Sequence, residues 1–175
     1  MSVLQLLRCA GGTVVLPDET LVLCDRLDGG NLIVNPPREV WDRSELTPAE
    51  LTMWSFLVAA TATAMLDVLP QLEGGCLNYW DAGTWALNEA AEPRGPKRGP
   101  LHRRVHLHLI GRSREARNPS MKWGEAPFFP PFAERHTWAA GNQRLTPEEC
   151  ASIISRARQL LAERYGVLES EFRGG

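Results

Sequence analysis

Cysteines are few in this sequence, and their arrangement is not typical of a metal site. The 175 residues contain four of them, Cys9, Cys24, Cys76 and Cys150, and no two form a CxxC pair. Zinc sites and disulfide frameworks both require closely spaced or numerous cysteines. We therefore expect no structural metal and no disulfide framework, and a reduced chain in the cytoplasm is the simplest interpretation.

Long hydrophobic runs are also missing. Residues 3–7 are too short and too weakly flanked for a signal peptide, and no apolar run approaches the length needed to cross a membrane. The alanine-rich stretch 56–66 carries Thr61 and Thr63, which favours a buried helix. We expect no membrane partner.

The charge balance lacks the excess of basic residues that is typical of proteins that bind nucleic-acid polymers. Nineteen lysines and arginines stand against 21 aspartates and glutamates, which gives a formal net charge of -2. A polymeric nucleic-acid partner is therefore not expected, whereas a compact nucleotide needs only local positive charge. The length, with 43% hydrophobic residues and no internal repeat, predicts a single domain over residues 1–175.

What the sequence does contain is one strand with side chains capable of chemistry. Residues 104–112 read Arg-Val-His-Leu-His-Leu-Ile-Gly-Arg, and alternate side chains of a strand point to opposite faces. One face is apolar; the other carries Arg104, His106 and His108. Imidazole can act as nucleophile, base or acid near neutral pH, and a guanidinium matches phosphate oxygens. The pattern indicates phosphoryl or nucleotidyl transfer.

Two other interpretations of this strand stay open. Antiparallel sheets often have one solvated face, so the same three side chains also fit an ordinary surface. A His-x-His pair can bind a metal, but the sequence offers no further ligands at the spacing of a metal site.

Two segments carry a helix start signal. Residues 47–50 and 146–149 both read Thr-Pro-x-Glu, which combines an N-cap, a proline at the first helical position and the glutamate of a capping box. Apolar residues at helical spacing follow each start. The sequence predicts helices over 47–69 and 146–166, the second closed by Gly166.

Short apolar or β-branched runs predict the remaining strands. We expect a hairpin of 13–16 with 20–24, a strand at 31–35, and a hairpin of 76–80 with 84–88 through a tight turn at 81–83. The fold class that follows is α+β, an antiparallel sheet of about five strands with two flanking α-helices.

Two loops complete the chain. Residues 92–100 are rich in proline, glycine and cations, among them Lys97 and Arg98, which fits either a solvated connection or a basic flap over a phosphate site. The stretch 114–144 holds many aromatics and several prolines, so it is expected to pack by its own side chains or to cover one face.

Several of these segments together resemble one known family. Residues 105–112 resemble the signature strand of the histidine triad (HIT) superfamily, His-φ-His-φ-His-φ-φ with φ apolar. Residues 30–38 resemble its early strand, Gly-His-hydrophobic-Val-x-Pro-Lys, with Asn31 at the histidine position. Residues 87–90 resemble the strand end that carries the family's asparagine, here Asn88.

The helix at 47–69 follows in the family's order, so the resemblance covers a core of about 13–112 and leaves 113–175, the aromatic-rich loop and C-terminal helix, outside it. The resemblance implies a HIT-like fold and cleavage of a phosphoanhydride bond in diadenosine polyphosphates, other dinucleoside polyphosphates or related nucleotide conjugates. In the family the middle histidine attacks the α-phosphorus and forms a nucleotidyl-histidine that water hydrolyses. His106 falls at that position, and His108 at the third, where a phosphate contact is implied.

The sequence also departs from the family. Arg104 stands at the first triad position, and Gly-Pro-Leu at 99–101 stands where many members have Gly-Gln-Ser. Because an arginine is permanently charged, we expect Arg104 to clamp the polyphosphate, with Lys97 and Arg98. The competing interpretation is an arginine in an exposed ion pair.

Asn31 and Asn88 are predicted to line the same pocket as the histidines, against the alternative that each is an ordinary turn or strand-end asparagine. No cofactor is identified, and a divalent metal such as Mg is expected only with the nucleotide. A homodimer is expected by analogy. The alternatives to a hydrolase are an inactive nucleotide-binding protein of the same fold and an interaction module built on tryptophan-rich loops.

Overall fold

The fold was analysed in a computed structural model that describes residues 4–82, 104–129, 134–168 and 172. It is an α+β fold, as the sequence predicts. The strands and α-helices, in chain order, are β1 (Leu4–Cys9), β2 (Gly12–Leu16), β3 (Asn31–Asn35), α1 (Pro48–Val68), β4 (Cys76–Ala82), β5 (His106–Arg112), α2 (Arg135–Ala140) and α3 (Pro147–Tyr165). Short 3-10 helices are η1 (Glu19–Leu21), η2 (Arg26–Asp28), η3 (Arg43–Glu45), η4 (Pro70–Leu72) and η5 (Pro119–Met121).

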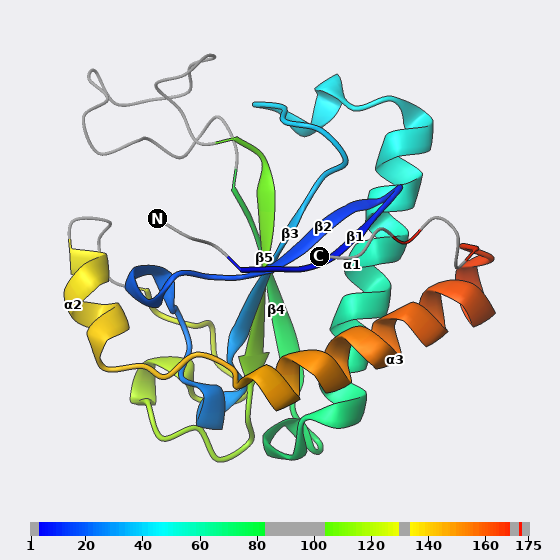
Figure 1. Cartoon of the computed structure of the whole chain (residues 1–175). Helices are drawn as coiled ribbons and strands as arrows, with labels where there is room; N and C mark the ends of the chain where they lie inside the picture. Colours follow the sequence, from blue (N-terminus) through cyan, green and yellow to red (C-terminus); the bar gives the residue numbers. More distant parts are fainter. Residues whose placement is uncertain (1–3, 83–103, 130–133, 169–171, 173–175) are drawn as a thin grey trace, which may run out of the picture.

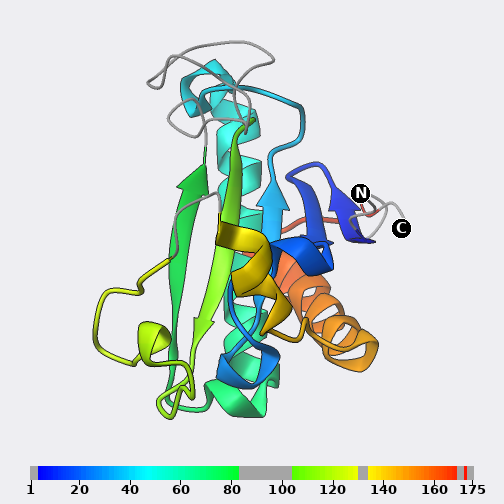
Figure 2. The same ribbon diagram turned by 90° about the vertical axis from the view of Figure 1, so that its left-hand side faces the viewer.

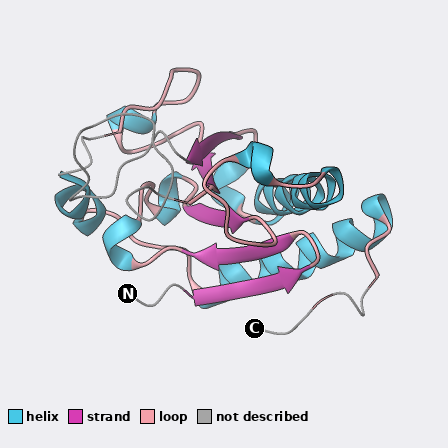
Figure 3. Ribbon diagram, turned by 90° about the horizontal axis from the view of Figure 1, so that it is seen from above, coloured by secondary structure: helices cyan, strands magenta, loops and turns pink. Residues whose placement is uncertain are grey.

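The five strands form one antiparallel sheet in the order β1-β2-β3-β5-β4 (Figure 1). In that view α1 and α2 lie on opposite sides of the sheet, and the turned view places α2 in front of it and α1 behind (Figure 2). Helices α1 and α3 pack against each other on one face (Figure 3). The sheet therefore has one face that is covered by α1 and α3, here called the helix-covered face, and a second face on the side of α2.

Both long helices begin as their local sequence predicts. The Thr47 hydroxyl accepts a hydrogen bond from Glu50 N, and the Glu50 carboxylate accepts one from Thr47 N; Thr146 and Glu149 repeat the arrangement. Helix α3 ends at Gly166, which adopts φ 67°. These contacts satisfy backbone groups that a helix end otherwise leaves unpaired.

The main core lies between the sheet and the two long helices. Alternate residues of β3 and β5 face it, including Leu32, Val34, Leu107 and Leu109, and α1 contributes Trp54. Helix α1 is, among the described helices, the one long and apolar enough to cross a membrane. Its alanine-rich stretch, 56–66, is largely buried in this core, as predicted.

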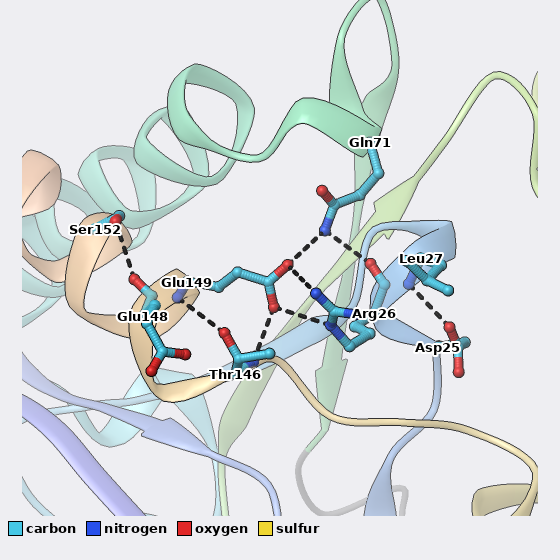
Figure 4. A network of polar contacts seen from close by, with 8 residues as sticks. All are labelled: Asp25, Arg26, Leu27, Gln71, Thr146, Glu148, Glu149 and Ser152. Carbon is cyan, nitrogen blue, oxygen red and sulfur yellow. Dashed lines mark hydrogen bonds and ion pairs between the residues drawn. The ribbon is translucent and has the colours of Figure 1, made fainter.

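A polar network ties the helix-covered side together at η2, η4 and the start of α3 (Figure 4). Arg26 Nε and Nη2 donate to the two carboxylate oxygens of Glu149 at 3.2 and 3.1 Å. Gln71 Nε2 donates to Arg26 O and to Glu149 Oε1. Three segments far apart in the sequence are thereby held at one corner.

The expected first hairpin is wrong in its second strand. Residues 20–24 are not a strand: η1 begins after Asp18, whose carboxylate accepts from Thr20 N, and the N–H groups of Leu23 and Cys24 donate to Asn31 Oδ1. The hairpin partner of β2 is β1, which the sequence prediction missed, and its other neighbour is β3.

The expected tight turn at 81–83 is also corrected. Asp81 and Ala82 belong to β4 and pair with Leu107 and His106. A pairing between neighbouring strands thus overrides the local turn signal of Asp-Ala-Gly. The second half of the predicted hairpin, 84–88, lies outside the described residues.

The aromatic segment after β5 covers part of the second face. A second apolar cluster contains Cys24, Ile110 and Met121, with Trp80, Phe129 and Trp138 packed against it. Of the two alternatives for 114–144, the described part fits the cover. Along β5 this face is buried at Ile110 and Arg112, whereas His106 is partly exposed.

Candidate active site

His106 lies at the open end of the second face, as the first residue of β5. The strand register brings three polar side chains side by side there. Val34 pairs with Leu107 on the core face, so Asn35 and His106 are neighbours on the other face, and Thr13 pairs with Asn35. Asn35 Nδ2 donates to Thr13 Oγ1 at 3.2 Å. His106 therefore stands at the end of a polar row across three strands.

The His106 ring is oriented by its own backbone. Its Nδ1 lies 2.8 Å from the carbonyl oxygen of Arg104. A carbonyl oxygen can only accept, so in this hydrogen bond Nδ1 must carry the proton. In the neutral ring the lone pair then resides on Nε2. This tautomer leaves Nε2 as the nucleophilic atom.

His108 lies two residues further along β5 and is more enclosed than His106. It is 7% exposed, and its ring meets that of His106 edge-on with centroids 4.9 Å apart. On its other side Trp80 lies 5.6 Å away and stacks in turn on Phe129 at 4.7 Å. The four rings form a continuous series of contacts, and the cover begins at His108.

A pocket of about 840 Å³ opens beside His106, at the end of the sheet. Its polar lining comprises Arg8, Thr13, Asn35, Arg38, Arg104 and His106, together with Glu39. Three guanidiniums stand against one carboxylate. The positive excess of this lining suits an anionic ligand.

Arg104 sits at the rim of this pocket. Its side chain is 45% exposed, forms an ion pair with Glu39, and lies 5.4 Å above the ring of Trp41. This geometry matches the exposed ion pair, which was the alternative to the phosphate clamp predicted for Arg104. Because Glu39 is itself 72% exposed, an anion in the pocket can compete for the guanidinium.

Asn31 lies away from the pocket. It pairs with Ile110 at the covered end of the face, is 2% exposed, and accepts from Leu23 N at 3.0 Å through Oδ1. Its Nδ2 is buried without a hydrogen-bond partner among the described residues. Asn31 and His106 thus lie on the same face of the sheet, but only His106 lines the pocket. Asn88, Lys97 and Arg98 lie outside the described residues.

Sequence reasoning missed the contributions of β1 and β2. Arg8 pairs with Thr13 in the register and lies on the same face as His106. The signal was present in the alternation of Leu7, Arg8 and Cys9, but β1 was not recognised as a strand. Arg38 was part of the family-like segment, and no role was assigned to it.

Other chemistries receive little support in the described part of the chain. No group of three or more histidine, cysteine or acidic side chains there could hold a metal ion. Burial, with Asp28 nearby, raises the pKa of the Cys24 thiol to about 12, and burial beside Glu149 raises that of Cys150 to about 11. Neither is a thiolate at neutral pH.

Comparison with known proteins adds no assignment: no family model matches the sequence, and no curated protein is significantly similar to it. The class of site must therefore be argued from geometry. A half-buried imidazole whose Nε2 carries the lone pair, beside a cation-lined pocket, can attack an electrophilic phosphorus, or can bind a phosphate without reacting.

Proposed function

We propose that the protein is a nucleotide hydrolase or nucleotidyl transferase that cleaves a phosphoanhydride bond in dinucleoside polyphosphates or related nucleotide conjugates. The observation that carries the proposal is the hydrogen bond from His106 Nδ1 to Arg104 O, which places the ring's lone pair on Nε2 in a residue that lines the arginine-rich pocket.

The proposed reaction has two displacements. His106 Nε2 attacks the α-phosphorus, the bond to the bridging oxygen breaks, and the leaving group departs with that electron pair. Water then attacks the phosphorus of the nucleotidyl-histidine, the P–N bond breaks, and the water proton passes to solvent or to the released group. Covalent catalysis replaces one difficult displacement by two easier ones.

His108 and the pocket arginines have supporting roles in this proposal. His108 donates to a phosphate oxygen, and Arg104 exchanges Glu39 for the substrate's phosphates. Donors fixed in advance at the charged oxygens stabilise the transition state. A phosphate leaving group is a weak base, so an arginine at position 104 can assist its departure by charge alone. A divalent metal such as Mg arrives with the nucleotide, and the cytoplasm is the proposed location.

A second candidate function is a nucleotide-binding protein of the same site without turnover. The ion pair between Arg104 and Glu39 favours this binding function, because Arg104, which replaces the first histidine of the family pattern, is already engaged by a carboxylate. Asn31 is buried at the covered end of the face, away from the pocket, and has no ligand contact in either candidate function.

The test is incubation with diadenosine tetraphosphate and identification of the nucleotide products. The proposal expects mononucleotide products from the wild type, none from His106→Ala, and wild-type turnover from His136→Ala, a control histidine exposed on α2. A thermal shift with nucleotide but no products selects the binding protein. The absence of both contradicts the two candidates and leaves an interaction module.

A further inference from the structure

We infer that the pocket is a subsite for the phosphate chain of the leaving group, which runs from His106 across β3 and β2 to Arg8 on β1. This inference rests on the proposed function for the identity of the substrate, and it adds Arg8 as a residue that selects long polyphosphates. The ligand class is a linear inorganic or nucleotide-linked polyphosphate of three or more phosphates.

The cross-strand register sets the direction of this subsite. Arg8 pairs with Thr13, and Thr13 with Asn35, whose neighbour on β5 is His106. The row crosses three strand spacings, about 14 Å at ~4.8 Å each. A phosphorus at His106 and a guanidinium at Arg8 are therefore joined by an extended chain and not by a single phosphate.

The other direction along the face is closed. Beyond His106, the ring of Trp80 lies against His108 and stacks on Phe129, and Ile110 is fully buried. The open volume of about 840 Å³ instead continues from His106 toward β1 and β2. Among the described residues, the pocket thus offers a leaving group one path.

Charge distinguishes Arg8 from the other two arginines. Arg38 is held by Glu50 through contacts of 2.9 and 3.3 Å, and Arg104 pairs with Glu39. Arg8 is exposed and has no ion-pair partner among the described residues. Since no carboxylate among those residues pairs with Arg8, an anion at this end of the pocket displaces none of them when it binds.

The hairpin that carries Arg8 is held close to the row by a glycine. Gly12 has φ 123°, and a Cβ there would lie 2.0 Å from Asn35 O. Only glycine allows the β1–β2 turn to approach the end of β3 in this way. Arg8 is thereby fixed at the pocket wall by the fold.

The test is isothermal titration calorimetry with inorganic tripolyphosphate at low salt, using the full-length protein. Arg8→Gln is expected to weaken binding about fivefold, or ~1 kcal/mol, and Arg8→Lys to retain most of the affinity. Orthophosphate binding should not change in either variant. Arg164→Gln, the same change at an exposed position on α3, is the matched control and should bind as wild type.

The outcomes separate this inference from the proposed function. Equal affinity of Arg8→Gln and Arg164→Gln, or no tripolyphosphate binding by the wild type, overturns the subsite even if diadenosine tetraphosphate is turned over. An Arg8-dependent tripolyphosphate site in a protein without His106-dependent turnover supports the subsite and contradicts the hydrolase.

Discussion

At the scale of single residues, the account depends on how backbone geometry selects one ring nitrogen of His106. The Arg104 carbonyl takes the Nδ1 proton, and the neighbouring His108 ring limits rotation. The backbone hydrogen bond supplies the tautomer that a nucleophile needs.

Glu39 is predicted to act as a competitor of the anionic ligand. Glu39→Gln removes the carboxylate that pairs with Arg104, so the guanidinium is available and the pocket is more positive. We expect tripolyphosphate to bind about two- to fivefold more tightly, since exposed ion pairs are worth under ~1 kcal/mol. Glu163→Gln, on α3, is the control by calorimetry. Unchanged affinity in Glu39→Gln would show that Arg104 takes no part in anion binding.

At the scale of elements, Arg112 joins the sheet to the segment that covers it. It is 2% exposed and donates to Asn78 Oδ1 and to the carbonyls of Met121, Lys122 and Glu125. One side chain thus satisfies several buried acceptors of a segment with little regular structure. The cover over Ile110 depends on it.

Arg112→Ala should therefore destabilise the protein strongly. Several acceptors would lose their donor, and the expected loss in the free energy of unfolding is about 3 kcal/mol. Arg114 is the next arginine in the chain and is exposed, although it also donates to a carbonyl, that of Gly74. Arg114→Ala should lower the free energy of unfolding by under ~1 kcal/mol. Urea unfolding compares the two; equal losses would contradict the anchoring role.

The start of α3 should show a pH-dependent stability. Burial opposes ionisation of Glu149, but hydrogen bonds from Arg26, Thr146 and Gln71 outweigh it and lower its pKa. A lowered pKa in the folded state gives stability that is present above the ordinary glutamate pKa of about 4.3 and is lost as pH falls through the folded value.

Glu149→Gln is accordingly expected to cost about 1–2 kcal/mol in the free energy of unfolding at pH 7, with the difference from wild type shrinking below pH ~4. Glu148→Gln, at the neighbouring position, has no such partners in the network and serves as the control (Figure 4). Chemical unfolding across this pH range makes the comparison. A difference that does not depend on pH would contradict the charge-based explanation.

At the scale of the whole molecule, we predict a homodimer. Strand β4 lies at an edge of the sheet, and its Tyr79 is 56% exposed, a residue type favoured in interface cores. Light scattering should give twice the monomer mass of 19.5 kDa. Tyr79→Asp should shift the mass toward the monomer, whereas Phe128→Asp, at another exposed aromatic, should not. A monomeric wild type at micromolar concentration would contradict the prediction.

How much of this molecule was predictable from sequence follows from the range of the interactions involved. Helices α1 and α3 begin with capping signals contained in four residues, β3 follows from its apolar run and β5 from alternation, so these were predicted correctly. Residues 20–24 look like a strand locally, but Asn31 Oδ1 accepts from the backbone N–H groups of Leu23 and Cys24. The conformation of this segment is therefore decided by Asn31, which lies outside the segment and is not considered in a local prediction.

The same distinction applies to the candidate site. The placement of His106, His108 and Arg104 on one face could be predicted from a period of two residues. The pocket could not, because Arg8 reaches it only through the order of strands in the sheet. Arg112 was equally out of reach, since its burial depends on carbonyls supplied by a later segment that folds back over the strand.

The central claim is that His106 Nε2 is a nucleophile toward phosphorus. The most direct measurement is mass spectrometry of wild-type protein rapidly quenched during reaction with diadenosine tetraphosphate. The account predicts an adenylyl group attached to the peptide that contains His106, absent from His106→Ala and present in His136→Ala. Nucleotide products formed without any adduct on that peptide, or turnover by His106→Ala close to wild type, would contradict it.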